Sequence, residues 1–183
     1  MDSLQIIADE IAACTKCELC KGRTNTVPGE GSVQAKILFI GEGPGAQEDK
    51  QGRPFVGRSG KLLREMIREV GWKEEDVFIA NVVKCRPPGN RDPKPEEIAT
   101  CQSYLNRQIA LIDPKIIVTL GRHAMGRELP EMKISQVHGK VFRRKNGRYF
   151  VPLYHPAVAL YSPAQKVTLM KDMKKLAKFI SQL

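Results

Sequence analysis

The sequence predicts an α/β protein in three layers, α/β/α, with a central, mostly parallel four-stranded sheet between two layers of helices. Three observations support this fold class. Four short runs rich in β-branched apolar residues alternate with longer segments of helical periodicity. Each run is apolar at nearly every position, as expected for parallel strands buried on both faces. A chain of 183 residues suffices for one core and is short for two, so residues 1–183 are expected to form a single domain.

Four strands and four helices follow from this alternation. The expected strands span residues 36–40, 77–83, 115–120 and 149–154. The expected helices run from an N-cap at Ser59 to a stop at Gly71, from about Pro95 to Ile112, onward from Gly121, and from about Pro163 to Leu183. The last helix should bury an apolar stripe beneath a row of lysines, and such a row is more often a solvated face than a binding site. The stripe comprises Val167, Met170, Leu176 and Ile180.

The charge of the chain favours a polyanionic partner. Lys and Arg number 30 against 20 Asp and Glu, which gives a formal net charge of +10. Each phosphate that a cation neutralises releases counterions, so nucleic acid is the first candidate partner, and a solubilising surface is the alternative. No apolar run approaches the roughly 18 residues of a membrane-spanning helix, and the first ten residues carry acids where a signal peptide carries bases. We therefore expect a cytoplasmic protein without membrane contact.

Five cysteines indicate a metal site. Cys14, Cys17 and Cys20 form a C-x2-C-x2-C motif, and Cys85 and Cys101 follow. An odd number of cysteines in a reducing compartment argues against a disulfide framework. Four thiolates are what a tetrahedral zinc or a [4Fe-4S] cluster requires, so one cysteine is spare, and spacing alone does not choose the metal. The alternative, a small buried hydrophobic residue, suits Cys20 better than the other four.

Polar residues follow three of the expected strands. The stretch FIGEGPG, residues 39–45, ends a strand abruptly in glycines and places Glu42 at the break. Asn81 and His155 also lie at or just after the carboxyl end of a strand. Ligands of parallel α/β sheets bind beyond this edge, so the fold should bring these three side chains to one rim.

Taken together, these residues resemble the family-four uracil-DNA glycosylases, the iron–sulfur branch of that superfamily. The shared motifs run in order over nearly the whole chain: C-x2-C at 14–17, RTNTVPGEG, ILFIGEGPG, QED, GRPFVG, NVVKCRPPGNRDP, Cys101 and the late HPA. The resemblance implies a uracil-DNA glycosylase-like fold and a [4Fe-4S] cluster that fixes the N-terminal segment to the domain. The implied cluster ligands are Cys14, Cys17, Cys85 and Cys101, with Cys20 at a variable position.

The resemblance also implies an activity in base excision repair of DNA. The protein should flip uracil out of single- or double-stranded DNA and hydrolyse its N-glycosidic bond, leaving an abasic site. We expect it to act as a monomer and without a Schiff-base lysine. The implied roles are base reading by Asn81, stacking by Phe55, stabilisation of the departing base at O2 by His155, and close backbone approach at Gly41 and Gly43.

Several points stay open. Glu42 is expected beside the reacting sugar, where it would orient water or stabilise positive charge, and Glu48 is the rival carboxylate. Leu160 is the expected wedge that enters the DNA, with Tyr161 as the alternative. His123 and His138 are expected to be surface or structural residues. A non-catalytic nucleic-acid module and a glycosylase with broader base preference, such as hypoxanthine, are the competing functions.

Overall fold

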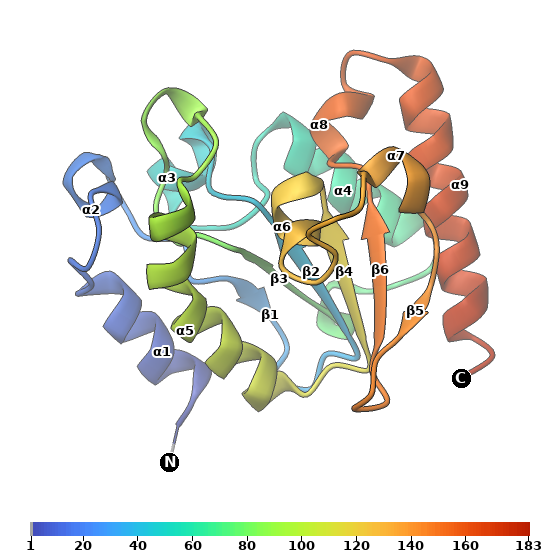
Figure 1. Cartoon of the computed structure of the whole chain (residues 1–183), viewed down its shortest axis with the longest axis horizontal. Coiled ribbons are helices and arrows are strands. Elements are labelled where there is room, and N and C mark those ends of the chain that lie inside the picture. Colours follow the sequence, from blue (N-terminus) through green and yellow to red (C-terminus); the bar gives the residue numbers. More distant parts are fainter. Residues whose placement is uncertain (1) are drawn as a thin grey trace.

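A six-stranded sheet forms the centre of the computed structural model, which describes residues 2–183 (Figure 1). The strand order is β1-β3-β2-β4-β6-β5. The strands are β1 (Glu30–Gly31), β2 (Ile37–Gly41), β3 (Val77–Asn81), β4 (Ile116–Leu120), β5 (Phe142–Arg143) and β6 (Tyr149–Leu153). The inner strands β3, β2, β4 and β6 are parallel, whereas β1 and β5 pair antiparallel at the two edges.

The α/β class and its four parallel strands agree with the sequence prediction, but the expected strand count of four was too low. The missing strands, β1 and β5, have two residues each and contain no apolar run. Their extended conformation comes from pairing with β3 and β6 rather than from local sequence. Such short edge strands carry almost no periodic signal.

Nine α-helices surround the sheet in the part of the chain that the structure describes. They are α1 (Leu4–Ala12), α2 (Leu19–Gly22), α3 (Ala46–Gln51), α4 (Arg58–Glu69), α5 (Pro95–Ile112), α6 (Arg122–Gly126), α7 (Ile134–Val137), α8 (Pro156–Ala159) and α9 (Pro163–Ile180). Two short 3-10 helices span Glu74–Asp76 and Pro88–Asn90. Within residues 2–183, no helix combines the length and apolar composition needed to cross a bilayer.

The two faces of the sheet pack against different helices. Alternate residues of β2 point to opposite faces, so Phe39 joins one apolar cluster with α4 and α9, and Leu38 joins another with α5 and α6. A further layer forms where Ile7 and Ile11 of α1 pack on Tyr104 of α5. Figure 1 shows α1 and α5 on one side of the sheet and α4, α8 and α9 on the other.

Two details of the helices differ from the sequence prediction. The N-cap of α4 is Gly57 rather than Ser59, because the chain turns into the helix directly after the loop that carries Phe55. In α9, Val167 is 69% exposed, contrary to the expected stripe, whereas Leu176 is buried and Met170 and Ile180 are partly buried against the core, as expected. Leu169, Asp172 and Met173 are also buried. Ser162 caps α9 by accepting a hydrogen bond from the N–H of Gln165.

The parallel strands place four loops at one edge of the sheet. The segments that follow β2, β3, β4 and β6 all leave the sheet at its carboxyl edge (Figure 1). These segments carry Glu42, Asn81, His123 and His155 or lie next to them.

Candidate active site

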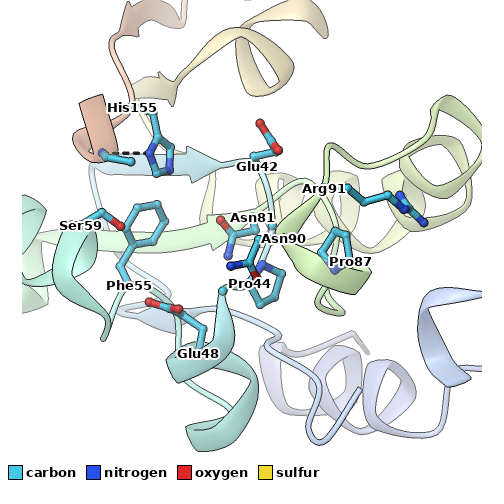
Figure 2. A pocket seen from close by; sticks show the side chains of 13 residues that line it. Glu42, Pro44, Glu48, Phe55, Ser59, Asn81, Pro87, Asn90, Arg91 and His155 are labelled. Carbon is cyan, nitrogen blue, oxygen red and sulfur yellow. Dashed lines mark hydrogen bonds between the residues drawn. The ribbon is translucent and has the colours of Figure 1, made fainter. Parts of the chain in front are cut away.

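A pocket of about 310 Å³ opens at this edge of the sheet, between the loops after β2, β3 and β6 and the helices α3 and α4 (Figure 2). It is lined by Glu42, Gly43, Pro44, Gly45, Glu48, Phe55, Ser59, Asn81, Pro87, Asn90, Arg91, His155 and Ala157. Six residues singled out from the sequence are thus brought together: Glu42, Gly43, Glu48, Phe55, Asn81 and His155. None of the thirteen lining residues is a lysine.

A glycine ends β2 because no side chain fits at position 41. A Cβ atom on Gly41 would lie 2.4 Å from Asn81 Oδ1 and 2.5 Å from Phe55 Cζ. The Gly41 backbone therefore lies close to both the Asn81 amide and the Phe55 ring. Gly43 is constrained in a similar way, because its Cβ would lie 2.8 Å from Val83 Cγ2.

Asn81 presents a buried acceptor without a donor. Its side chain, at the end of β3, is 2% exposed. Its Oδ1 has no hydrogen-bond partner within residues 2–183. A buried polar atom left unpaired costs about 1–3 kcal/mol. The pocket is therefore suited to a ligand that donates a hydrogen bond at this point.

Phe55 is held in an unusual backbone conformation. Its φ of 53° lies in the left-handed region, which costs a non-glycine residue roughly 1–2 kcal/mol. The buried Glu48 fixes the peptides that follow: its Oε1 accepts hydrogen bonds from the N–H groups of Val56 at 2.9 Å and Gly57 at 2.7 Å. The Phe55 ring lies beside the imidazole of His155, with ring centroids 5.9 Å apart. Glu48 thus orders the loop that positions an aromatic wall.

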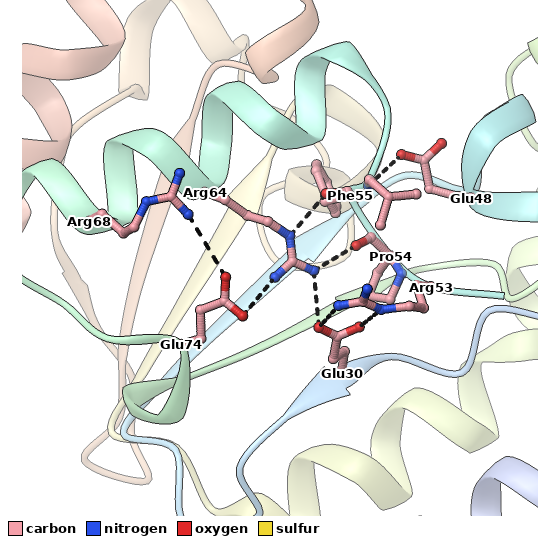
Figure 3. Close-up of polar contacts among 9 residues, drawn as sticks. Glu30, Glu48, Arg53, Pro54, Phe55, Arg64, Arg68 and Glu74 are labelled. Carbon is pink, nitrogen blue, oxygen red and sulfur yellow. Dashed lines mark hydrogen bonds and ion pairs between the residues drawn. The ribbon is translucent and has the colours of Figure 1, made fainter. Parts of the chain in front are cut away.

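Arg64 of α4 holds the same loop from its other side (Figure 3). Its Nε donates to the carbonyl of Phe55 at 3.0 Å, and its Nη2 donates to the carbonyl of Pro54 at 2.9 Å. The guanidinium also pairs with the carboxylates of Glu30 at 3.3 Å and Glu74 at 3.4 Å. Nothing in the local sequence distinguishes Arg64 from a surface arginine, so sequence reasoning missed it.

His155 is a neutral hydrogen-bond donor to the pocket. It caps α8, and its Nδ1 accepts a hydrogen bond from the N–H of Ala157 at 3.1 Å. A neutral imidazole that accepts at Nδ1 carries its proton on Nε2. Burial lowers the pKa of His155 to about 4, and the Glu48 carboxylate opposes this shift only in part. The ring is therefore uncharged at neutral pH.

Glu42 lies at the mouth of the pocket, with its side chain partly exposed. Burial raises the pKa of its carboxyl above the ordinary value. The charge of His123 opposes that rise in the pKa, the Asp92 carboxylate adds to it, and Arg122 again opposes it. The two pocket carboxylates therefore differ in their surroundings. Glu48 accepts hydrogen bonds from backbone N–H groups, whereas Glu42 faces the side chains of other residues.

His123 lies beside Glu42 but does not line the pocket. Its Nε2 lies 3.7 Å from Glu42 Oε2 and 3.2 Å from Asp92 Oδ2. Among residues 2–183, these three form the one group of His, Cys, Asp or Glu side chains whose ligand atoms lie within 4.8 Å of one another. Arg122 also pairs with Asp92, and its Nε donates a hydrogen bond to His123 Nε2 at 3.1 Å. His138, in contrast, binds the buried Asp172 at 2.6 Å.

Three polar lining residues were not assigned a pocket position from the sequence. The sequence predicts Ser59 as a helix cap and gives Asn90 and Arg91 no role. Arg91 forms two hydrogen bonds with the carboxylate of Glu97, at 2.7 and 2.9 Å. The available signal for Asn90 and Arg91 was the motif NVVKCRPPGNRDP, in which both stand.

The cysteines lie away from the pocket, between α2, α5 and the segment after β3. Cys85 and Cys101 are buried and pack with Leu19 and Cys17. Cys14 packs beside α1 and Tyr104, and Cys20 belongs to neither apolar cluster.

Arg23 joins the two halves of this cysteine group. Its Nη1 donates to Cys85 Sγ at 3.3 Å and to the carbonyl of Cys14 at 2.8 Å. Burial raises the pKa of Cys101 to about 11 and also raises the pKa values of Cys85 and Cys17. A metal that binds these thiols would have to displace their protons.

The loop between α8 and α9 follows the segment that carries the pocket residues His155 and Ala157. Leu160 is partly buried and packs against the main apolar core. Tyr161 is 80% exposed. The more accessible apolar side chain of this loop is therefore Tyr161.

Comparison with known proteins gives a consistent set of relatives. The family model described as the uracil DNA glycosylase superfamily matches residues 28–183. The chain is 52% identical to the type-4 uracil-DNA glycosylase of Sulfurisphaera tokodaii, over 96% of this chain and 84% of that protein. It is 43% identical to the type-4 enzyme of Thermotoga maritima, over 98% and 95%. It is 30% identical to the type-5 uracil-DNA glycosylase of Thermus thermophilus, over 70% and 68%.

The packing of α4 against the Phe55 loop can be tested with one glycine. A Cβ atom on Gly60 would lie 2.1 Å from the carbonyl carbon of Phe55. Gly60→Ala should therefore lower the free energy of unfolding by about 1–3 kcal/mol, measured by urea denaturation. Gly126→Ala is the matched control, because a Cβ atom on Gly126 would meet no neighbouring group within 4 Å and alanine is the better helix former. Equal stability of the two variants would contradict the close packing.

Proposed function

The chain belongs to the uracil-DNA glycosylase superfamily, and from this membership and the pocket we infer that it excises uracil from DNA in base excision repair. The reaction is hydrolysis of the N-glycosidic bond, which releases free uracil and leaves an abasic site. The observation that carries the proposal is the buried, unpartnered Oδ1 of Asn81.

Asn81 would read the edge of the flipped base. Its Oδ1 can accept a hydrogen bond from uracil N3–H, and its amide nitrogen can donate to O4. Cytosine presents an acceptor at N3 and a donor at its amino group, so the same amide in the same orientation would meet mismatched groups. The lack of a protein donor for Oδ1 within residues 2–183 supports this role, since the base would supply the missing bond.

Phe55 would stack on the flipped base. The hydrogen bonds that Glu48 accepts and that Arg64 donates hold its loop before any ligand binds. A prearranged ring loses little conformational freedom on binding, which favours affinity for the planar base. The nearby glycine backbone at Gly41 allows this approach.

His155 would stabilise the departing base. As the bond from N1 to the sugar breaks, its electron pair stays on uracil, and negative charge develops at O2. A neutral imidazole with its proton on Nε2 can donate to that oxygen, and one such donor is worth about 3 kcal/mol. The low pKa of His155, about 4, supports this role because the ring remains a neutral donor at physiological pH.

Glu42 is the carboxylate that we propose for the sugar side of the reaction. It would orient the water that adds to the anomeric carbon and would stabilise the positive charge that develops there. Glu48 is the weaker candidate, because Oε1 of its buried carboxylate accepts hydrogen bonds from the N–H groups of Val56 and Gly57. We assign Glu48 to the ordering of the loop.

The cysteine group fits an iron–sulfur cluster better than a single zinc ion. A tetrahedral zinc would hold its sulfur ligands about 3.8 Å apart. Within residues 2–183, no three cysteine sulfurs lie within 4.8 Å of one another, so the cysteines do not form the close group that a tetrahedral zinc requires. We propose that a [4Fe-4S] cluster binds here and supplies a cross-link between the N-terminal segment and α5. The proposed ligands are Cys14, Cys17, Cys85 and Cys101; Cys20 lies outside both apolar clusters.

The substrate would be uracil in single- or double-stranded DNA, handled by a monomer. The chain has a formal net charge of +10, and contacts of its Lys and Arg side chains with phosphates would supply most of the affinity for DNA. We propose Tyr161 rather than Leu160 as the side chain that enters the space left by the base. The 80% exposure of Tyr161 and the packing of Leu160 on the core support this choice.

The activity can be tested by release of free uracil from labelled DNA. The parent protein should release uracil, and His155→Ala should lower the single-turnover rate about 100-fold with a much smaller loss of DNA affinity. DNA binding without any uracil release by the parent would indicate a non-catalytic module. Faster release of another base, such as hypoxanthine, from a panel of lesions would indicate a different specificity. Loss of binding in His155→Ala with normal turnover of bound DNA would make His155 a docking residue.

The cluster can be tested by colour and metal content of anaerobically purified protein. The parent should absorb broadly near about 400 nm, Cys85→Ser should lose this absorbance, and Cys20→Ser should keep it. Iron and zinc analysis accompanies the spectra. Colourless parent protein with one zinc would contradict the cluster, and a colourless Cys20→Ser variant would contradict the choice of ligands.

The wedge can be tested by comparing duplex and single-stranded substrates. Tyr161→Ala should lower excision from duplex DNA about 10-fold with little effect on single strands, because one aromatic stack on a base contributes about 1–3 kcal/mol. Tyr161→Phe should restore the parent ratio. Leu160→Ala is the matched control and should lower stability without changing the ratio of duplex to single-strand rates. A lower ratio of duplex to single-strand rates in Leu160→Ala, with an unchanged ratio in Tyr161→Ala, would indicate that Leu160 is the wedge.

A further inference from the structure

The guanidinium of Arg23 joins three segments of the chain around the cysteine group. Arg23 directly follows α2 and reaches back to the end of α1, where its Nη2 donates to the carbonyl of Ala12 at 2.9 Å. Its Nη1 donates to the carbonyl of Cys14 at 2.8 Å and to Sγ of Cys85, which lies beyond β3, at 3.3 Å. One side chain therefore contacts a proposed cluster ligand of the N-terminal segment and another of the domain.

The hydrogen bond to sulfur is not explained by the end of α1. The last carbonyls of a helix lack partners within the helix, and a cation near them is favoured by the helix dipole. These needs account for the bonds to the carbonyls of Ala12 and Cys14 but not for the bond to Cys85. A thiol sulfur is a weak acceptor, whereas a charged acceptor roughly doubles the strength of a hydrogen bond. The contact of Arg23 with the buried Cys85 is therefore suited to a thiolate.

Arg23 carries a positive charge that its hydrogen-bond partners do not compensate. A guanidinium stays protonated in proteins, and the three acceptors of Arg23 are two carbonyls and a sulfur. Within residues 2–183, no Asp or Glu forms an ion pair with Arg23, whereas the nearby Lys21 pairs with Glu18 at 2.8 Å. A partly buried cation is costly without an anion beside it. Thiolates at this site would supply the anion, because the charges of four such ligands outweigh that of an iron–sulfur core.

The other buried cation next to Cys85 has different partners. Lys84 is 1% exposed, and its Nζ donates to Oε1 of Gln108 at 2.7 Å and to the carbonyl of Pro28 at 3.2 Å. Arg23 rather than Lys84 is thus the cation whose side chain contacts the sulfur of Cys85.

We propose that Arg23 is a positioning residue of the cysteine site, which holds the Cys14 segment beside Cys85 and compensates the charge of the thiolates when a [4Fe-4S] cluster is bound. The proposal rests on the cluster proposed above and adds to it a residue that binds no iron. Two properties of the cluster should then depend on Arg23. The cluster should be lost more slowly, because Arg23 fixes its ligands. Its reduction potential should be higher, because a cation and an N–H donor beside a sulfur favour the more negative, reduced form.

The test compares the anaerobically purified parent with Arg23→Gln and Arg23→Lys. Arg23→Gln removes the charge, so under an iron chelator its absorbance near about 400 nm should bleach about 10-fold faster than that of the parent. Its reduction potential, measured by spectroelectrochemical titration, should fall by about 60 mV, a tenfold change in a one-electron equilibrium. Arg23→Lys keeps the charge without the forked donors, so it should keep most of the parent potential and still bleach faster than the parent.

Arg144→Gln is the matched control. Arg144 donates to the carbonyl of Glu128 at 3.1 Å, and it follows β5, at the edge of the sheet far from β3. The control removes an arginine that binds a carbonyl but no sulfur, so both the bleaching rate and the potential should match those of the parent.

A parent-like potential in Arg23→Gln would overturn the proposal even if the variant were less stable, because Arg23 would then only cap α1. An equal fall in the potential of Arg23→Gln and Arg23→Lys would exclude the charge and would also overturn it. If Arg23→Gln folds by circular dichroism but holds no cluster, Arg23→Lys decides: a coloured variant with a near-parent potential supports the role of the charge, and a colourless one overturns it. A colourless parent would instead remove the proposed cluster, and the proposal for Arg23 with it.

Discussion

The pocket depends on the backbone of Phe55 being held in a left-handed conformation from both sides. Glu48 accepts hydrogen bonds from the two N–H groups that follow Phe55, and Arg64 donates to the carbonyls of Phe55 and Pro54. Hydrogen bonds to charged groups contribute about 1.5–3 kcal/mol each, which exceeds the roughly 1–2 kcal/mol cost of the conformation. The aromatic wall is therefore in place before a base arrives. This constraint also explains why position 60 is glycine, since α4 touches the Phe55 backbone there.

The proposed chemistry needs two opposite electrostatic environments in one pocket. His155 must be neutral to donate a hydrogen bond to a developing anion, and burial provides this by lowering its pKa to about 4. Glu42 must be charged although burial raises its pKa, and here the neighbouring His123 and Arg122 oppose the effect of burial. The sheet places both groups at its carboxyl edge, where His155 follows β6 and lies beside the ring of Phe55, and Glu42 follows β2 and faces α6.

The cysteine group lies apart from the pocket. Cys14 and Cys17 belong to the N-terminal segment, whereas Cys85 and Cys101 belong to the domain around β3 and α5. Arg23 already links these parts through the carbonyl of Cys14 and the sulfur of Cys85. A cluster held by the same cysteines would add a cross-link at the point where this segment packs on α5.

The amino-acid sequence by itself determined the class of the fold, the four parallel strands, helix α5 and the family, because continuous apolar runs and ordered motifs are local properties of the chain. It also identified Asn81, Phe55 and His155, since each stands in such a motif. Only the tertiary structure decided which carboxylate is engaged by backbone N–H groups, how deeply each position of α9 is buried, and that Arg64 and His123 lie next to residues of the pocket. These depend on which strands are neighbours and on how far each side chain is removed from water. Strand neighbours and side-chain burial both depend on residues that are distant in sequence, so no local sequence pattern predicts them.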